Sequence, residues 1–201
     1  MTGTKIDGIR DTKYLGVTLN SKLKWDTHIA KISSAANRMI GLLWRNLRHS
    51  PPKIKEMAYQ SYVRPKVEYC SSIWDPHTQK DINKLEMVQK RGARFVANIP
   101  HRHHSGHHTS ISATVQSLGW KSLKERRQNN RLLFLFKVSN GLVDVPPNYQ
   151  PVLRSPQPPR GNQFQYQRLT AEVEVFQYSF LPRTITDWNS LSPTAATADS
   201  L

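Results

Sequence analysis

The segment Trp25–Leu47 carries the most regular hydrophobic pattern in the chain, and it limits the possible folds more than any other feature. Its apolar residues recur at steps of three and four, which is the period of one helix face. They are Ile29, Ile32, Ala36, Met39, Ile40 and Leu43. The pattern predicts a helix of roughly six turns, with Asp26 or Thr27 as the N-cap. A helix with one apolar face needs partners to cover that face.

Two later segments with the same periodicity are the expected partners. One begins at Ser50, carries Pro51 and Pro52 in its first turn, and is interrupted by Pro65, with Val67–Trp74 as a displaced continuation. The other runs from a capping-box variant at Thr78 to about residue 98. The predicted apolar stripes are Ile54, Met57, Ala58 and Tyr62 in the first segment, and Ile82, Leu85, Val88, Phe95 and Val96 in the second. We therefore expect a three-helix bundle.

The flanking segments predict smaller elements. Alternation over Lys13–Leu19, a turn at Asn20-Ser21 and a return over Leu23–Trp25 indicate a hairpin, which alone is marginal in water and suggests a larger sheet. Two helices are expected after the bundle, over 111–118 and from Ser122 to Gly141. Further on, a Pro-rich linker (145–159), two short strands (164–168 and 172–178), a helix (179–191) and a disordered end are expected.

These elements predict a mainly α chain in which a three-helix bundle follows a short β-hairpin and precedes a helical segment and a small, partly irregular α+β tail. The predicted divisions are residues 1–25 for the hairpin, 26–99 for the bundle, 100–144 for the His-rich loop and later helices, and 145–201 for the Pro-rich linker and tail.

The net charge of +15 and the pI of 10.2 favour a polyanionic partner. Residues 1–100 hold most of the excess, with 18 Lys and Arg against 8 Asp and Glu. The alternative is a solvated surface that keeps the protein soluble. The predicted nucleic-acid contacts are Arg38, Arg45, Lys80, Lys84, Lys90, Arg91, Arg94, Arg126 and Arg127, and we expect those of the bundle, Arg38 to Arg94, to form a shared side. If about six phosphates were neutralised, affinity would fall roughly a thousandfold between 50 and 200 mM salt.

Several other classes of protein are disfavoured. Cys70 is the single cysteine, so a reducing compartment fits, and the charged N-terminal segment and short apolar runs predict neither secretion nor a membrane partner. We expect a nuclear or cytoplasmic location. Residues 101–108 hold five of the eight histidines, but their sequence indicates a loop with weak adventitious metal binding, not a fixed site. No phosphate-binding glycine loop or catalytic triad spacing is present in the sequence.

Short motifs occur in a characteristic order along nearly the whole chain. They are Lys13-Tyr-Leu-Gly-Val17, Leu23-Lys-Trp25, His28-Ile29, Arg64-Pro65, Glu68-Tyr69, Trp74-Asp75-Pro76, Leu85-Glu86, Val88 to Phe95, Leu118-Gly119-Trp120, Leu123 with Glu125-Arg126-Arg127, Lys137, Asn140 to Val143, Arg183-Thr184-Ile185 and Trp188 to Leu191. This ordered set resembles the reverse transcriptases of non-LTR (LINE-type) retrotransposons, of the jockey-like kind. The His-rich run replaces a mixed loop of that family.

The resemblance implies the end of a polymerase palm, a thumb and a post-thumb tail. It implies a primer-grip-like hairpin formed by Tyr14, Leu15, Gly16, Val17 and Trp25. Polymerisation needs two Mg²⁺ ions held by carboxylates, normally including an Asp-Asp pair, and the sequence contains no such pair. We therefore expect a fragment that lacks catalysis, needs no cofactor itself, and binds RNA/DNA hybrid or duplex without sequence preference.

Three alternatives remain open at the level of sequence. The chain could be a protein-interaction module that docks on a polymerase palm supplied by another chain. It could be a relic without function. An autonomous enzyme is the least favoured, because the paired carboxylates are missing from the sequence.

Overall fold

The computed structural model describes residues 10–99, 110–156 and 164–196, so the His-rich segment 101–108 lies outside the described residues. The chain forms two compact units. The first comprises Met1–Cys70 and Pro76–Leu123, and the second comprises Ser71–Asp75 and Lys124–Leu201. This division differs from the four predicted segments, because Ser71–Asp75 belongs to the second unit although the bundle surrounds it in sequence.

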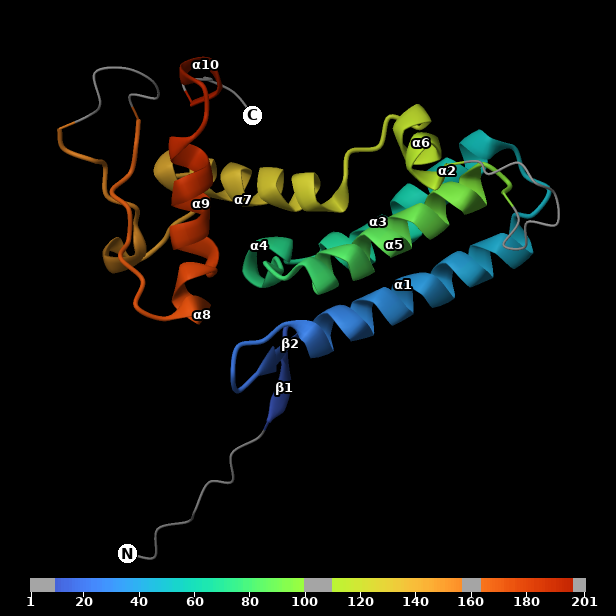
Figure 1. Cartoon of the computed structure of the whole chain (residues 1–201), viewed down its shortest axis with the longest axis horizontal. Coiled ribbons are helices and arrows are strands. Elements are labelled where there is room, and N and C mark those ends of the chain that lie inside the picture. The colour runs from blue at the N-terminus through green and yellow to red at the C-terminus, as the bar shows by residue number, and fades with distance from the viewer. Residues whose placement is uncertain (1–9, 100–109, 157–163, 197–201) are drawn as a thin grey trace, which may run out of the picture. The chain divides into compact units, whose positions relative to one another are not determined.

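The first unit contains a β-hairpin and a helical bundle (Figure 1). Its elements are β1 (Asp11–Tyr14), β2 (Val17–Asn20), α1 (Asp26–Asn46), α2 (Pro52–Tyr62), α3 (Arg64–Glu68), α5 (Gln79–Val96) and α6 (Ile111–Ser117). α1 and α5 lie side by side. α2 packs against both of them, and α3 packs against α1 and α2. The mainly α class with an N-terminal hairpin is confirmed. No helix in the described ranges has the length and apolar character needed to cross a bilayer.

The hairpin turns at a different place from the one predicted. β1 and β2 pair with Tyr14 opposite Val17, so Leu15 and Gly16 form the two-residue turn in place of Asn20-Ser21. Both turn residues have positive φ, 44° at Leu15 and 86° at Gly16. This is the backbone of the mirror-image turns that match the twist of a hairpin, and glycine adopts it without strain.

The bundle confirms two of the three predicted apolar stripes. α1 buries Ile29, Ala36, Ile40 and Leu43, and α5 buries all five of its predicted apolar residues. The predicted N-cap of α1 is wrong, because Trp25 occupies that position without a side-chain hydrogen bond and Asp26 is already helical. Pro65 lies in the first turn of α3, where its missing N–H costs nothing.

α2 turns inward a face next to the one predicted, and of the predicted stripe only Ala58 is half-buried. It buries Lys55 and Tyr59, while Ile54, Met57 and Tyr62 are about half exposed. The lack of a side chain at Gly92 leaves room for the Tyr59 ring, because a Cβ at Gly92 would lie 2.2 Å from that ring. The buried Lys55 Nζ donates to the carbonyl of Arg48, beyond the end of α1, and to the side chain of Asn98, beyond the end of α5. Specific partners thus override hydrophobicity in choosing the buried face.

The second unit is built around α7 (Leu123–Ser139) and α9 (Phe180–Asn189), both as predicted. The other elements are α4 (Ser71–Trp74), a 3₁₀ turn η1 (Pro147–Tyr149), α8 (Glu174–Gln177) and α10 (Pro193–Ala196). Its apolar core contains Leu135, Tyr166, Ile185 and Trp188. Gly141 follows α7 with a φ of 68°, as expected for a helix C-terminus.

The tail contains less β-structure than predicted. The two strands expected at 164–168 and 172–178 are wrong, because the first contributes one bridge, Leu153 to Tyr166, and the second contains α8. Asn189 replaces a partner strand, since its side-chain amide both accepts from the Tyr166 N–H and donates to the Tyr166 carbonyl, each at 2.9 Å. Residues 193–196, expected to be disordered, form α10.

Candidate nucleic-acid interface

The predicted contacts on α1 lie on its outer face. Arg38 and Arg45 are seven residues apart and exposed, and Lys31 continues the same spacing toward the N-terminus. Seven residues make nearly two helical turns, so the three cations form one stripe with steps of about 10 Å. By helical periodicity this stripe lies opposite the buried Ile29, Ala36 and Ile40. We call Lys31, Arg38 and Arg45 the α1 stripe.

The predicted contacts on α5 form a second stripe. Lys80, Lys84 and Arg91 are exposed and share one face by their spacing of four and seven residues, and Lys90 and Arg94 are half-buried beside them. We call these five residues the α5 stripe. The buried residues of α5 lie on the opposite face. The two stripes thus occupy the outer faces of two helices that pack side by side.

The basic residues at the start of α7 have another environment. Arg126 is half-buried, and Arg127 has no exposed surface. The Arg127 Nε donates to Asp75 Oδ1 at 2.7 Å. A side chain with no exposed surface cannot reach a phosphate, so we remove Arg127 from the interface.

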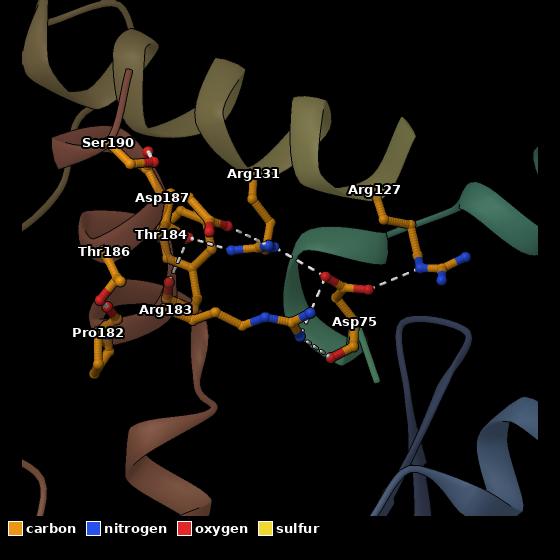
Figure 2. Close-up of polar contacts among 10 residues, drawn as sticks. Asp75, Arg127, Arg131, Pro182, Arg183, Thr184, Thr186, Asp187 and Ser190 are labelled. Carbon is orange, nitrogen blue, oxygen red and sulfur yellow. Dashed lines mark hydrogen bonds and ion pairs between the residues drawn. The ribbon is translucent and has the colours of Figure 1, made fainter. Parts of the chain in front are cut away.

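Asp75 is the centre of a buried ionic network in the second unit (Figure 2). Its carboxylate accepts from Arg127 Nε and from Arg131 Nε at 2.9 Å, and Arg183 Nη1 lies 3.3 Å from it. Arg131 also bonds to Asp187 at 2.7 Å, and Arg183 Nη1 donates to the Asp75 carbonyl. Burial lowers the pKa of the Arg183 guanidinium, while the nearby Asp75 charge acts in the opposite direction.

The network was missed as a site by sequence reasoning, although a signal was present. Leu123, Arg127, Arg131 and Leu135 follow one another at steps of four, and all four are buried. Two arginines on the apolar stripe of a helix indicate an ionic partner inside the fold, because an unpaired buried charge is costly. The partner, Asp75, is 52 residues away from Arg127 in sequence.

The hairpin residues named by the resemblance divide into exposed and buried ones. Tyr14 and Leu15 are 65% and 72% exposed, Trp25 is half-buried and Val17 is buried. A Cβ at Gly16 would lie 3.3 Å from the Tyr69 ring, so the turn packs closely on the residue after α3. The Tyr69 hydroxyl donates to the Leu15 carbonyl at 3.1 Å.

The hairpin is also attached to α1 through His28. The Thr18 N–H donates to His28 Nδ1 at 3.2 Å, so this nitrogen carries no proton. Burial, and then the charge of Lys31, lower the pKa of His28 and favour this neutral form. Across the described residues, no three His, Cys, Asp or Glu side chains gather in a way that could hold a metal ion.

Over about half its length, the chain is similar in sequence to a transposon protein named as a probable polymerase. The relative is named "Probable RNA-directed DNA polymerase from transposon BS", from Drosophila melanogaster, and is 28% identical over 104 residues. These residues are 50% of this chain but only 12% of the relative. No family model and no solved structure matches the chain. The similarity supports a region of the non-LTR reverse transcriptase type, as the ordered motifs indicate.

Proposed function

We propose that this reverse-transcriptase-like chain is a catalytically incomplete part of a retrotransposon RNA-directed DNA polymerase that binds template–primer nucleic acid without sequence preference. The observation that carries the proposal is the α5 stripe, on a helix whose opposite face is fixed in the bundle core. A row of cations on a rigid helix can follow a phosphate backbone without reading bases. In this proposal the helices α1, α2 and α5 act as a thumb.

The stripe is suited to phosphates because five cations are grouped along one helix that carries two acidic residues, Asp81 and Glu86. Lys80, Lys84 and Arg91 are exposed on a face that spans about 16 Å of helix. The α1 stripe adds Arg38 and Arg45 on the neighbouring helix, and Arg126 is a further candidate in the second unit. The partner we propose is an RNA/DNA hybrid or duplex, in the nucleus or cytoplasm.

Catalysis is not proposed for this chain. Its sequence has no Asp-Asp pair to hold the two Mg²⁺ ions of polymerisation, so the ions would matter only to an intact polymerase. We expect no product in a primer-extension assay with Mg²⁺. Extension of the primer would overturn this part of the proposal.

The experiment measures binding of the full chain to a fluorescent RNA/DNA hybrid at several salt concentrations. If the five residues of the α5 stripe contact phosphates, log Kd changes with log salt with a slope of about 4.5. Replacing three of them (Lys80→Gln, Lys84→Gln, Arg91→Gln) should lower the slope by about 2.7. A slope near zero in the unmodified chain would refute phosphate binding.

The matched control removes the same charge elsewhere in the first unit. Lys22, Lys53 and Lys66 are exposed and lie outside both stripes, so their replacement by Gln should leave most of the slope intact. If both triple variants reduce the slope equally, attraction is due to net charge and the α5 stripe is not an interface. Adding Arg38→Gln and Arg45→Gln to the α5 variant should reduce the slope by about 1.8 more if one duplex contacts both stripes.

A second candidate function is docking on a polymerase palm supplied by another chain. The observation in its favour is the hairpin, whose Tyr14 and Leu15 side chains are more than 60% exposed although the backbone around them is attached to the bundle. Formation of a complex with the rest of the polymerase, in the absence of nucleic acid, tests this function.

A further inference from the structure

Among the described residues, one backbone edge of the hairpin has no neighbouring strand. β1 pairs only with β2 in the described sheet. The two-residue turn makes Tyr14 and Val17 a hydrogen-bonded pair, so alternation directs the N–H and C=O of Asp11 and Lys13 away from β2. The corresponding outward group on β2 is the Thr18 N–H, which donates to His28. The edge of β2 is therefore covered by α1, while the edge of β1 is open as far as the structure describes the chain.

This open edge is held in place, unlike that of an isolated hairpin. His28 binds the backbone of β2, Tyr69 binds the turn, and Val17 and Thr18 are 4% and 5% exposed. A free two-stranded hairpin is only marginally ordered in water. An ordered, exposed edge is a template to which an extended segment can add as a further strand.

The surroundings of the edge favour one kind of segment. Arg10, Lys13, Lys22 and Lys24 are exposed in and around the hairpin, against a single acidic residue, Asp11, between positions 10 and 25. The exposed Tyr14 and Leu15 side chains lie at the tip of the same hairpin. An acidic strand with an apolar residue near the tip would complement both the charge and the apolar surface.

We propose that the outer edge of β1 accepts an extended, acidic segment of an RNA-directed DNA polymerase as a third strand. This inference rests on the proposed function, because it takes the polymerase as the source of the segment. The relative gives a reason to choose this source. The matched region is only 12% of the relative, so in that protein a region of this type belongs to a much longer chain that is named as a probable polymerase. Backbone hydrogen bonds to Asp11 and Lys13 provide the pairing, and the charges select the segment.

The experiment uses the full chain labelled with ¹⁵N and, as the probe, the Drosophila polymerase with its matched region removed. Addition of the probe should slow hydrogen exchange at the Lys13 amide about tenfold. Lys13→Pro removes the outward N–H and is sterically tolerated at an edge, so it should weaken the complex about tenfold. The control Lys13→Gln keeps the N–H and should weaken it only about twofold.

Several results would overturn the inference. They are the absence of a complex, equal effects of Lys13→Pro and Lys13→Gln, or protection of Lys13 by the RNA/DNA hybrid or by a second copy of the chain in place of the probe. If Lys13→Pro disrupts the hairpin, the exchange measurement on the unmodified chain still decides. The α5 triple variant should bind the probe normally, so failure of nucleic-acid binding is distinguished from failure of strand addition.

Discussion

The two units of the chain are stabilised by different means. In the first unit, Tyr59 stacks on Trp120 with ring centroids 4.5 Å apart, and the guanidinium of Arg64 lies within 6 Å of both rings. In the second unit, Asp75 is surrounded by Arg127, Arg131 and Arg183 beside the apolar core. The first arrangement depends on shape and close packing, whereas the second depends on the balance of buried charges. A substitution that destabilises one unit should therefore differ in kind from one that destabilises the other.

The comparison also indicates what several of the ordered motifs contribute to the two units. Asp75, Arg127 and Arg183 come from three motifs far apart in sequence and meet at the ionic network of the second unit (Figure 2). Gly92 and Trp120, from two other motifs, meet at Tyr59 in the first unit. Asp75, Arg127, Gly92 and Trp120 are buried, so these motif residues contribute to packing.

The largest expected effect is the loss of Asp75. Asp75→Asn keeps the shape but leaves three guanidinium groups with too little buried negative charge, and should destabilise the second unit by about 3–5 kcal/mol. Hydrogen exchange should show lost protection in α7 and α9 and retained protection in α1 and α5.

The matched control is Asp187→Asn, because Asp187 is 25% exposed and binds one arginine of the network. Its effect should be smaller than that of Asp75→Asn. Equal loss of protection in both units after Asp75→Asn would contradict the difference between them.

Close packing in the first unit is tested by Gly92→Ala. The new Cβ would lie 2.2 Å from the Tyr59 ring, which must then move from its stack on Trp120. We expect destabilisation of about 3 kcal/mol, measured by urea unfolding.

Gly41→Ala is the control for this substitution. Gly41 lies in α1, and its nearest neighbour to an added Cβ is the end of the Arg45 side chain at 3.9 Å. Alanine is a better helix former, so this variant should gain up to about 1 kcal/mol. If Gly92→Ala left the free energy of unfolding unchanged, the packing around Tyr59 would not be tight.

Lys55→Met sharpens the comparison, because it removes a buried charge from the unit that depends mainly on packing. Methionine keeps the volume but leaves the Arg48 carbonyl and the Asn98 side chain without the Lys55 donor. We expect a loss of about 1–3 kcal/mol in thermal or urea unfolding of the first unit. An unchanged midpoint would mean that water replaces the amine at both acceptors.

The smallest expected effect is a pH dependence confined to the first unit. The pKa of His28 is lowered from 6.5 in the folded chain, so the unfolded chain binds a proton more readily. The contribution of neutral His28 to the free energy of unfolding is therefore complete above pH 6.5, and it is lost as the pH falls from there through the folded-state pKa. Urea unfolding followed at several pH values should show this loss, and His28→Gln should reduce it. A loss that persists in the variant would assign it to another group.

Sequence periodicity was sufficient where a helix buries a continuous apolar stripe. α1, α5, α7 and α9 were predicted within one or two residues, and the buried faces of α1 and α5 were predicted as well. It failed for α2, because Ile54 and Met57 suggested one face, whereas the packing of Tyr59 on Gly92 turns the neighbouring face inward. The basic run at the start of α7 was misleading for Arg127, whose spacing of four from Leu123 and Arg131 follows the buried stripe of that helix.

The sequence by itself determined the helical character, the basic surface of α5 and the resemblance to a reverse transcriptase, because these depend on local order and composition. The tertiary structure alone decided that Ser71–Asp75 joins a unit formed mostly after residue 123, that Lys55 is buried, and which edge of the hairpin is open. The physical reason is that these features depend on pairs of groups far apart in the chain. A local pattern records the character of each group but does not identify its partner.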